Sequence, residues 1–347
     1  MSIKLDFDDV LIVPQFTDVT SRSQVELKRT LHGRWGSSIT GVPIVAANMD
    51  GVGTFRMNRS LAQFGMFTAI VKHRTYEEWN TEMVAITEQH RGVENNLCIT
   101  IGMTEGELQN AIKISALLKS FHVDTPKIVI DVANGYMNPF YDFVQKVRDA
   151  IPNAFIMAGT VVTAEAVERV INCGADIARV GIGTGAVCTT RRVAGVGYPQ
   201  FSALMECVPA ADSVGGGVMS DGGCVFAGDF AKAFGAGAEM VMAGSIFAGH
   251  DESECEIRDG KVTFYGMSSR VAQETHGTLQ HYRASEGRVV QIPYKGLVEH
   301  TVMNILGGIR SACAYVDALN LQEFAEQAHF IQVNKQLNTS LEKYTIQ

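Results

Sequence analysis

Eight short apolar segments recur along the chain, and each ends in a cluster of small or polar residues. The segments occupy residues 43–49, 66–71, 97–102, 127–133, 155–159, 177–183, 217–222 and 240–245. They are continuously apolar and do not alternate with polar residues, which is typical of strands buried on both faces of a parallel sheet. We therefore expect eight parallel strands.

Helical patterns fill most of the connections between these segments. Residues 163–175 begin with a threonine cap and end near a glycine, and residues 229–238 show a shorter version of the same pattern. The helical pattern is weakest in 184–216. Eight strands that alternate with helices predict an α/β fold of the (β/α)8, or TIM, barrel type in preference to a doubly wound sheet.

The chain after the eighth predicted strand is irregular and polar, from about residue 246 to 292. Asp259 and Gly260 predict a tight hairpin turn, and the rest of the stretch has no clean period. We expect a long excursion that covers the mouth of the barrel, where such loops often carry a site. Helical patterns return over 297–330, and the sequence predicts one domain over 1–347 because no linker or repeat interrupts it.

Composition narrows the classes of partner. The 347 residues are 46% apolar and carry a net charge of −8 without a dense run of Lys or Arg, so nucleic acid and membranes are poor candidate partners. No apolar stretch approaches the roughly 20 residues that span a bilayer, and the N-terminal residues do not resemble a secretory signal. The seven cysteines are scattered without a C-x-x-C pair, which favours neither a zinc site nor a disulfide framework. We expect a reduced, cytoplasmic protein.

The segment "RVGIGTGAVCTTRR" places Cys188 at the end of a glycine-rich loop. A free cysteine is commonly a small buried hydrophobe, but this loop offers little for Cys188 to pack against. A nucleophilic role requires thiolate character, for which Arg191 and Arg192 lie close in sequence, and the hydroxyls of Thr189 and Thr190 could transfer protons. The glycines would let carbonyls converge on a monovalent cation, or amides on an anion.

The same loop formally contains the dinucleotide fingerprint G-x-G-x-x-G/A, as "GIGTGA". That fingerprint must open a helix that receives the pyrophosphate, and the following "VCTTRRVAGVG" is a poor helix start. We therefore do not interpret the loop as a Rossmann-type cofactor site.

Polar residues follow the predicted strands at their carboxyl ends, where barrels of this kind carry their active sites. They are Asn48, Asp50, Lys72, His73, Asp131, Asn134, Cys188, Asp221, Gly244 and Ser245. "SDGG" (220–223) and "AGS" (243–245) follow the last two strands, whose loops commonly bind phosphate. Asp221 would repel a phosphate but can accept a hydrogen bond from a ribose diol. The pattern predicts a nucleoside monophosphate with its base near Cys188.

Seven motifs together resemble the IMP dehydrogenase/GMP reductase family, and within it the GMP reductases. In chain order they are "ANMDGVGTF", "DVANGY", "GIGTGAVCTTR", "SDGGC", "FYGMSS", "YRASEG" and "LGGIRSACAY", and the resemblance covers nearly the whole chain. It implies a (β/α)8 barrel that assembles as a homotetramer and converts GMP and NADPH to IMP, ammonia and NADP⁺. It also implies that Cys188 forms a thioimidate at purine C2, and that Thr190 and Glu286 protonate the departing ammonia.

The resemblance implies binding residues as well. A potassium ion would lie on the backbone carbonyls of Gly181, Gly183 and Cys188. GMP would contact Asp221, Gly222, Gly223, Gly244, Ser245, Gly266, Met267, Ser268, Arg283, Ser285 and Gly287. NADPH would contact Ser21, Arg22, Lys72, Asp131, Val132, Ala133, Tyr282 and Ser311. Arg22 and Lys72 suit the additional phosphate that distinguishes NADPH from NADH.

Other functions remain possible at this point. NAD-dependent oxidation of the IMP dehydrogenase type is disfavoured, because no regulatory domain follows the second strand and no Arg-Tyr flap follows "GMSS". A non-catalytic nucleotide sensor is disfavoured by the intact Cys188, Thr190 and Glu286.

The sequence also departs from the family pattern. The residues Gly51, Val71, Arg74, Thr184 and Ala186 stand where the family usually has Thr, His, Tyr, Pro and Ser. That serine normally bonds the nucleotide phosphate, so the chain is either a divergent GMP reductase, which we favour, or a reductase of a modified purine nucleotide.

Overall fold

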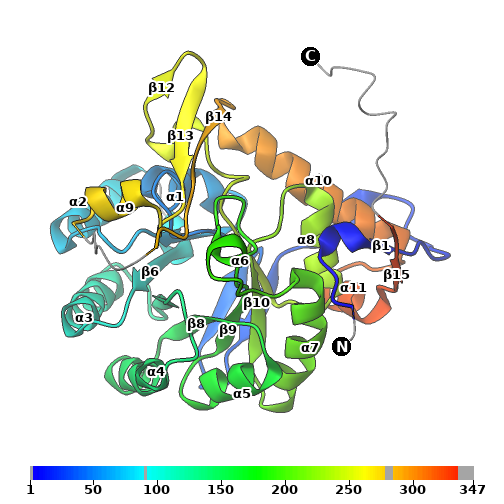
Figure 1. Ribbon diagram of the computed structural model, residues 1–347, viewed down its shortest axis with the longest axis horizontal. Coiled ribbons are helices and arrows are strands. Elements are labelled where there is room, and N and C mark those ends of the chain that lie inside the picture. The colour runs from blue at the N-terminus through cyan, green and yellow to red at the C-terminus, as the bar shows by residue number, and fades with distance from the viewer. Residues whose placement is uncertain (1–2, 90–91, 278–283, 335–347) are drawn as a thin grey trace.

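The computed structural model of the chain describes residues 3–89, 92–277 and 284–334 (Figure 1). Eight parallel strands close a barrel in chain order from β4 to β11, and β11 pairs with β4 to complete the ring. The strands are β4 (Ile44–Ala46), β5 (Phe67–Ile70), β6 (Leu97–Ile101), β7 (Lys127–Asp131), β8 (Phe155–Val161), β9 (Ile177–Val180), β10 (Gly217–Asp221) and β11 (Met240–Ala243). Seven of them lie within predicted segments and β8 extends two residues beyond the predicted 155–159, so the (β/α)8 barrel is confirmed.

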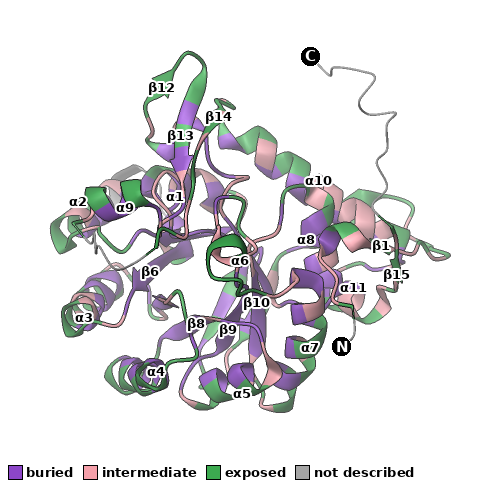
Figure 2. Ribbon diagram, in the orientation of Figure 1, coloured by how far each residue is buried: buried purple, intermediate pink, exposed green. Residues whose placement is uncertain are grey.

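The strands read as continuous apolar runs because they are covered on both faces. Every residue of β4, β5, β6, β9 and β11 is buried. Figure 2 shows this burial along the central strands, while the outer sides of the surrounding helices are exposed. Side chains therefore fill the interior of the barrel, and space for a ligand lies at its ends.

Helices follow the strands and form the outer ring. They are α1 (Phe55–Ala62), α2 (Tyr76–Gln89), α3 (Glu105–Ser120), α4 (Asn138–Ala150), α5 (Ala164–Asn172), α7 (Gln200–Ser213), α8 (Ala227–Gly235) and, after the excursion, α10 (Val298–Tyr315). Helix α5 begins after Thr163 as predicted, but the Thr163 hydroxyl makes no cap bond and lies 3.0 Å from the Tyr136 hydroxyl.

The stretch 184–216, where the helical pattern is weakest, contains the short α6 (Thr190–Val193) and the 14-residue α7. The pattern of α7 is blurred because the polar Gln200 is buried and Met205 is 49% exposed. The side-chain NH2 group of Gln200 has two acceptors inside the fold, since it donates to the carbonyl of Val180 and to the hydroxyl of Ser220.

The excursion after β11 forms a small sheet and a helix beside the barrel mouth. The elements are η4 (Asp251–Ser253), β12 (Ile257–Arg258), β13 (Lys261–Tyr265), α9 (Arg270–Thr275) and β14 (Val289–Pro293). Asp259 and Gly260 both have positive φ, at 50° and 68°, as the predicted hairpin turn requires. Strand β14 then pairs with β13, so the two ends of the excursion are tied together.

Several elements outside the barrel were not predicted. They are η1 (Phe7–Asp9), β1 (Val10–Ile12), η2 (Arg22–Gln24), β2 (Arg29–His32), β3 (Ser38–Gly41), η3 (Val93–Asn96) and β15 (Phe330–Gln332). Helix α11 (Leu321–Gln327), in contrast, lies within 297–330, where the sequence predicts helical patterns. Strands β1 and β15 pair antiparallel and join the two ends of the described chain. Three residues are too few to show a period, and the partner lies at the far end of the sequence.

Candidate active site

A cavity of about 320 Å³ opens at the carboxyl ends of the barrel strands. The loops after β4, β7, β9, β10 and β11 line it together with Thr160 of β8, and the excursion supplies Phe264, Gly266, Met267, Ser268, Glu286 and Gly287. The predicted site residues that line it are Asp131, Val132, Ala133, Gly181, Gly183, Cys188, Thr190, Asp221, Gly222, Gly223, Gly244, Ser245, Gly266, Met267, Ser268, Glu286 and Gly287. Residues that are far apart in the sequence, from Asp131 to Gly287, thus meet in one cavity of the size that small ligands occupy.

Cys188, Thr190 and Glu286 form a connected chain of polar groups in this cavity. The Thr190 hydroxyl donates to a Glu286 carboxylate oxygen at 2.7 Å and lies 3.3 Å from the Cys188 sulfur. Backbone pairing fixes this arrangement, because the Thr189 N–H donates to the Glu286 carbonyl at 2.8 Å and Cys188 bridges Gly287 antiparallel. A proton can pass between carboxylate and hydroxyl beside the thiol.

Arg191 does not supply the charge that its sequence position suggested for Cys188. Its guanidinium is bound instead by the Asp6 carboxylate at 2.8 Å and by the Tyr198 carbonyl at 2.6 Å. The Arg191 stem packs against Gly183, where a Cβ would lie 2.6 Å from Arg191 Cγ, and Gly183 has φ +77°. The loop therefore requires glycine at 183 for conformation and for space.

Arg179 is a central site residue that sequence reasoning missed. It is 3% exposed at the end of β9, and it donates to Asp131 at 2.8 Å and to Asp221 at 2.7 Å. Burial opposes the charge of Arg179, but the two carboxylates outweigh burial and raise its pKa. Burial raises the pKa of Asp221, and Arg179 partly offsets that effect. One buried cation thus holds together a predicted nucleotide residue and a predicted cofactor residue.

The loop after β10 has the backbone that a close approach to phosphate requires. Gly222 and Gly223 have φ +85° and +83°. A Cβ at Gly222 would lie 2.5 Å from the Thr184 hydroxyl, and that hydroxyl donates to the Asp221 carbonyl at 2.8 Å. Thr184, one of the departures from the family pattern, therefore ties the loop after β9 to the end of β10.

The other departures divide by location. Ala186 lines the cavity, and its carbonyl accepts from the Arg288 guanidinium at 2.7 Å. Gly51, Val71 and Arg74 do not belong to the described lining.

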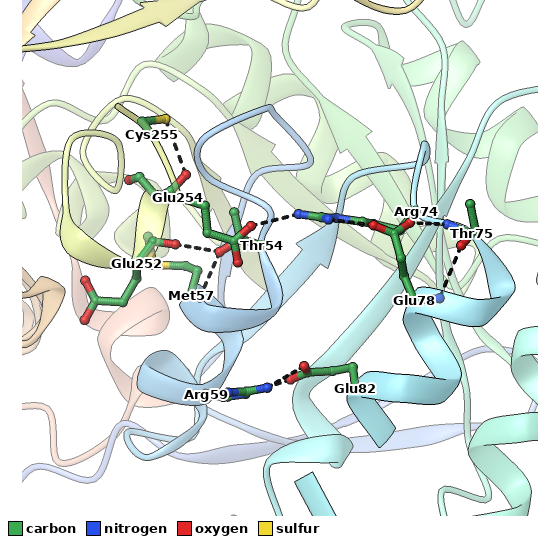
Figure 3. A network of polar contacts seen from close by, with 11 residues as sticks. Thr54, Met57, Arg59, Arg74, Thr75, Glu78, Glu82, Glu252, Glu254 and Cys255 are labelled. Atoms are coloured by element: carbon green, nitrogen blue, oxygen red, sulfur yellow. Dashed lines mark hydrogen bonds and ion pairs between the residues drawn. The ribbon is translucent and has the colours of Figure 1, made fainter. Parts of the chain in front are cut away.

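Arg74 instead takes part in a separate polar network between α2 and the start of the excursion (Figure 3). It binds Glu78 and Glu254, each at 2.8 Å. Cys255 fills the space beside Gly51, where a Cβ would lie 2.6 Å from its sulfur. Arg74 and Gly51 are therefore matched by neighbouring residues outside the described lining of the cavity.

The predicted cofactor residues fall into two separated groups. Asp131, Val132 and Ala133 line the cavity. Ser21 caps η2 and Arg22 is its first residue, and η2 packs against α10, the helix that carries Ser311.

Two further predicted residues, Lys72 and Ser285, do not belong to the described lining of the cavity. Lys72 lies 4.0 Å from the Glu107 carboxylate. Ser285 donates to the Gly287 carbonyl at 3.1 Å, beside the wall. Tyr282 and Arg283 lie outside the described residues.

A family model described as "IMP dehydrogenase / GMP reductase domain" matches residues 4–340. The chain belongs to the IMP dehydrogenase/GMP reductase family. Within this family it is similar to "GMP reductase" of Caenorhabditis elegans, with 49% identity over 96% of this chain and 93% of the relative. It is also similar to "GMP reductase 2" of Mus musculus, at 47% over 97% and 96%. "GMP reductase 1" of Homo sapiens is 46% identical over 97% of each chain.

The family resemblance inferred from the motifs is therefore confirmed. For the described segments of this family member, the helices are too short or too polar for any of them to cross a membrane.

Proposed function

We propose that this chain catalyses the NADPH-dependent reductive deamination of GMP to IMP and ammonia. The observation that carries the proposal is the contact chain from Cys188 through Thr190 to Glu286 inside a ligand-sized cavity of a family member. Similarity over nearly the full length to proteins named GMP reductase supports the same reaction.

In the proposed reaction the Cys188 thiolate attacks C2 of the purine and a C–S bond forms. The C2–N bond then breaks, and the amino group leaves as ammonia after Thr190, backed by Glu286, delivers a proton to it. A nicotinamide cofactor, when bound, would supply the hydride that C2 requires, and Cys188 would leave as the thiolate as the C–S bond breaks. The overall balance is GMP, NADPH and one proton to IMP, NADP⁺ and ammonia.

The proposed contacts hold the nucleotide at its phosphate and at its ribose. Gly222, Gly223, Gly244 and Ser245 offer backbone amides to its phosphate, and the left-handed backbone of the first two supports this role. Asp221, held by Arg179, would accept from the ribose. The remaining proposed contacts are Gly266, Met267, Ser268, Ser285 and Gly287, together with Arg283 outside the described residues.

The cofactor site would need more than one copy of the chain. Asp131, Val132 and Ala133 lie in the cavity, while Ser21, Arg22 and Ser311 gather at η2 and α10 away from its lining. The family resemblance implies that both groups of residues contact the same NADPH molecule. We therefore propose that the second group completes the site of a neighbouring copy, in the homotetramer that the resemblance implies. Lys72 would bind the additional phosphate, and Tyr282 lies outside the described residues.

A potassium ion is proposed on the backbone carbonyls of Gly181, Gly183 and Cys188. All three residues line the cavity in one loop, and the left-handed Gly183 supports a backbone that turns its carbonyls toward an ion.

All seven cysteines are free, which supports the proposed reduced, cytoplasmic setting.

Product analysis tests the reaction against its alternatives. The proposal expects IMP and ammonia from GMP and NADPH. A dehydrogenase would instead produce xanthosine monophosphate from IMP and NAD⁺, and GMP that binds without turnover would indicate a sensor or a modified purine as the substrate.

The cysteine variants provide a matched pair for the covalent step. Cys188→Ala is expected to abolish turnover and leave GMP binding largely intact. Cys224→Ala is the control: Cys224 also lines the cavity, but burial raises the pKa of its thiol, so its loss should leave turnover. Near-normal turnover of Cys188→Ala would overturn the covalent route.

A further inference from the structure

Asp50, in the loop after β4, joins two positions of the excursion, Tyr265 and His276, beside the cavity. One of its carboxylate oxygens accepts from the Tyr265 hydroxyl at 2.8 Å and lies 2.7 Å from His276 Nε2. A carboxylate can only accept here, so His276 Nε2 carries a hydrogen. The His73 ring, from the loop after β5, stacks on His276 with ring centres 3.7 Å apart and planes at 11°.

The two partners of Asp50 bracket the part of the excursion that reaches the cavity. Tyr265 is the last residue of β13, and His276 follows α9. Between them lie Gly266, Met267 and Ser268, which line the cavity. The Asp50 backbone N–H also points to the Met267 sulfur at 3.4 Å. Asp50 therefore binds the residues on both sides of the segment 266–275, and its N–H contacts Met267 near the start of that segment.

The surroundings favour a lasting connection. The side chains of Asp50 and His276 are 19% and 17% exposed, so water competes only partly for their bond. Burial, followed by the hydrogen bond to Asp50, raises the pKa of Tyr265, and its hydroxyl therefore stays a donor. Burial lowers the pKa of His73, as do the neighbouring His276 and Lys72, which favours a neutral ring in the stack.

We propose that Asp50 is a positioning residue for the nucleotide, because it holds the 266–276 segment, and with it Met267 and Ser268, in the cavity wall. The inference rests on the proposed function, since it takes Met267 and Ser268 to contact GMP. Asp50 itself does not belong to the described lining of the cavity. Its loss should therefore weaken substrate binding more than it slows the chemical steps.

The test measures KM for GMP and kcat in four variants, which are Asp50→Ala, Asp50→Asn, Tyr265→Phe and the double variant of Asp50→Ala with Tyr265→Phe. Asp50→Ala removes the shared acceptor and should raise KM for GMP about tenfold while kcat stays within about threefold, since hydrogen bonds to charged groups carry effects of this order. Asp50→Asn retains an acceptor oxygen and should give an intermediate KM. As a single substitution, Tyr265→Phe should raise KM for GMP. In the Asp50→Ala background it should raise KM little further, because the Asp50 acceptor of Tyr265 is already gone.

A second Tyr–Asp pair in the same excursion region provides the matched control. The Tyr294 hydroxyl donates to Asp251 at 2.6 Å, and neither residue lines the described cavity. Tyr294→Phe and Asp251→Asn should leave KM for GMP unchanged. A rise in KM equal to that of the Asp50 variants would show a general loosening of the excursion and overturn the specific role of Asp50.

Hydrogen–deuterium exchange gives a readout that does not depend on activity. Amides in 266–276 should exchange faster in Asp50→Ala than in wild type or in the Tyr294→Phe control. Unchanged exchange with unchanged KM, or additive effects of Asp50→Ala and Tyr265→Phe, would overturn the proposal. Failure of wild-type protein to turn over GMP would overturn the proposed function instead, and the exchange comparison would still decide the positioning role.

Discussion

Replacing Arg179 with methionine tests whether the two carboxylates of the cavity depend on one buried cation. Methionine keeps much of the volume and removes the charge. Removal of one partner from a buried ion pair costs about 3–5 kcal/mol of unfolding free energy. The carboxylate side chains of Asp131 and Asp221 are 31% and 19% exposed, so partial hydration places the expected loss near about 3 kcal/mol at neutral pH.

The same substitution has a pH dependence with a definite sign. Burial already raises the pKa of Asp221, and Arg179 opposes that rise, so the pKa of Asp221 should be higher still in the variant. A carboxyl whose pKa is higher in the folded than in the unfolded protein favours folding when protonated. The loss of stability should therefore be full above the folded pKa of Asp221 and become smaller as the pH falls through it.

Urea unfolding at about pH 7.5 and about pH 5 measures both effects. Arg148→Met is the matched control: it breaks an Arg–Asp pair with Asp176 at the opposite end of the barrel, with side chains only 6% and 0% exposed. It should cost stability, about 4 kcal/mol, without changing KM for GMP in the folded fraction. A loss below about 1 kcal/mol for Arg179→Met, or a loss equal at both pH values, would refute the reasoning.

Three further predictions concern the proposed chemistry and its ligands. Glu286→Gln should slow ammonia release about a hundredfold and hydride transfer less, in single-turnover experiments that follow both; an unchanged ammonia step would remove Glu286 from the acid role. Ala186→Ser restores the family's phosphate-binding hydroxyl and should lower KM for GMP about tenfold, because a hydrogen bond to a charged group is worth about 1.5–3 kcal/mol; an unchanged KM would mean that the phosphate does not reach residue 186. Exchange of potassium for tetramethylammonium should reduce kcat, and added potassium should restore it; equal rates in both salts would contradict the cation site.

Much of the barrel could be predicted because its signals are local. A strand buried on both faces shows as an unbroken apolar run, as in β11 (Met240–Ala243), and the Asp259–Gly260 turn is encoded by residues that tolerate positive φ. Cys188 was recognised because a glycine-rich loop is a poor place for a packing residue. The loop motif is sufficient to predict that Cys188 lies at the site, whereas the role of Glu286 follows only from the family resemblance.

What could not be predicted depends on partners that are distant in sequence. Arg179 reads as an interruption of an apolar strand, because its two carboxylate partners lie 48 and 42 residues away. The contact between Asp50 and His276 spans 226 residues and follows no motif. Arg191 shows the converse error, in which closeness in sequence suggested a contact that Asp6 takes instead.

The most direct test of the account follows NADPH absorbance and ammonia together in wild-type protein supplied with GMP and potassium, with Cys188→Ala run in parallel. The account predicts one ammonia and one IMP for each NADPH consumed by wild type, and no consumption by Cys188→Ala although it still binds GMP. NADPH consumption without ammonia, or ammonia release that survives the loss of Cys188, would contradict it.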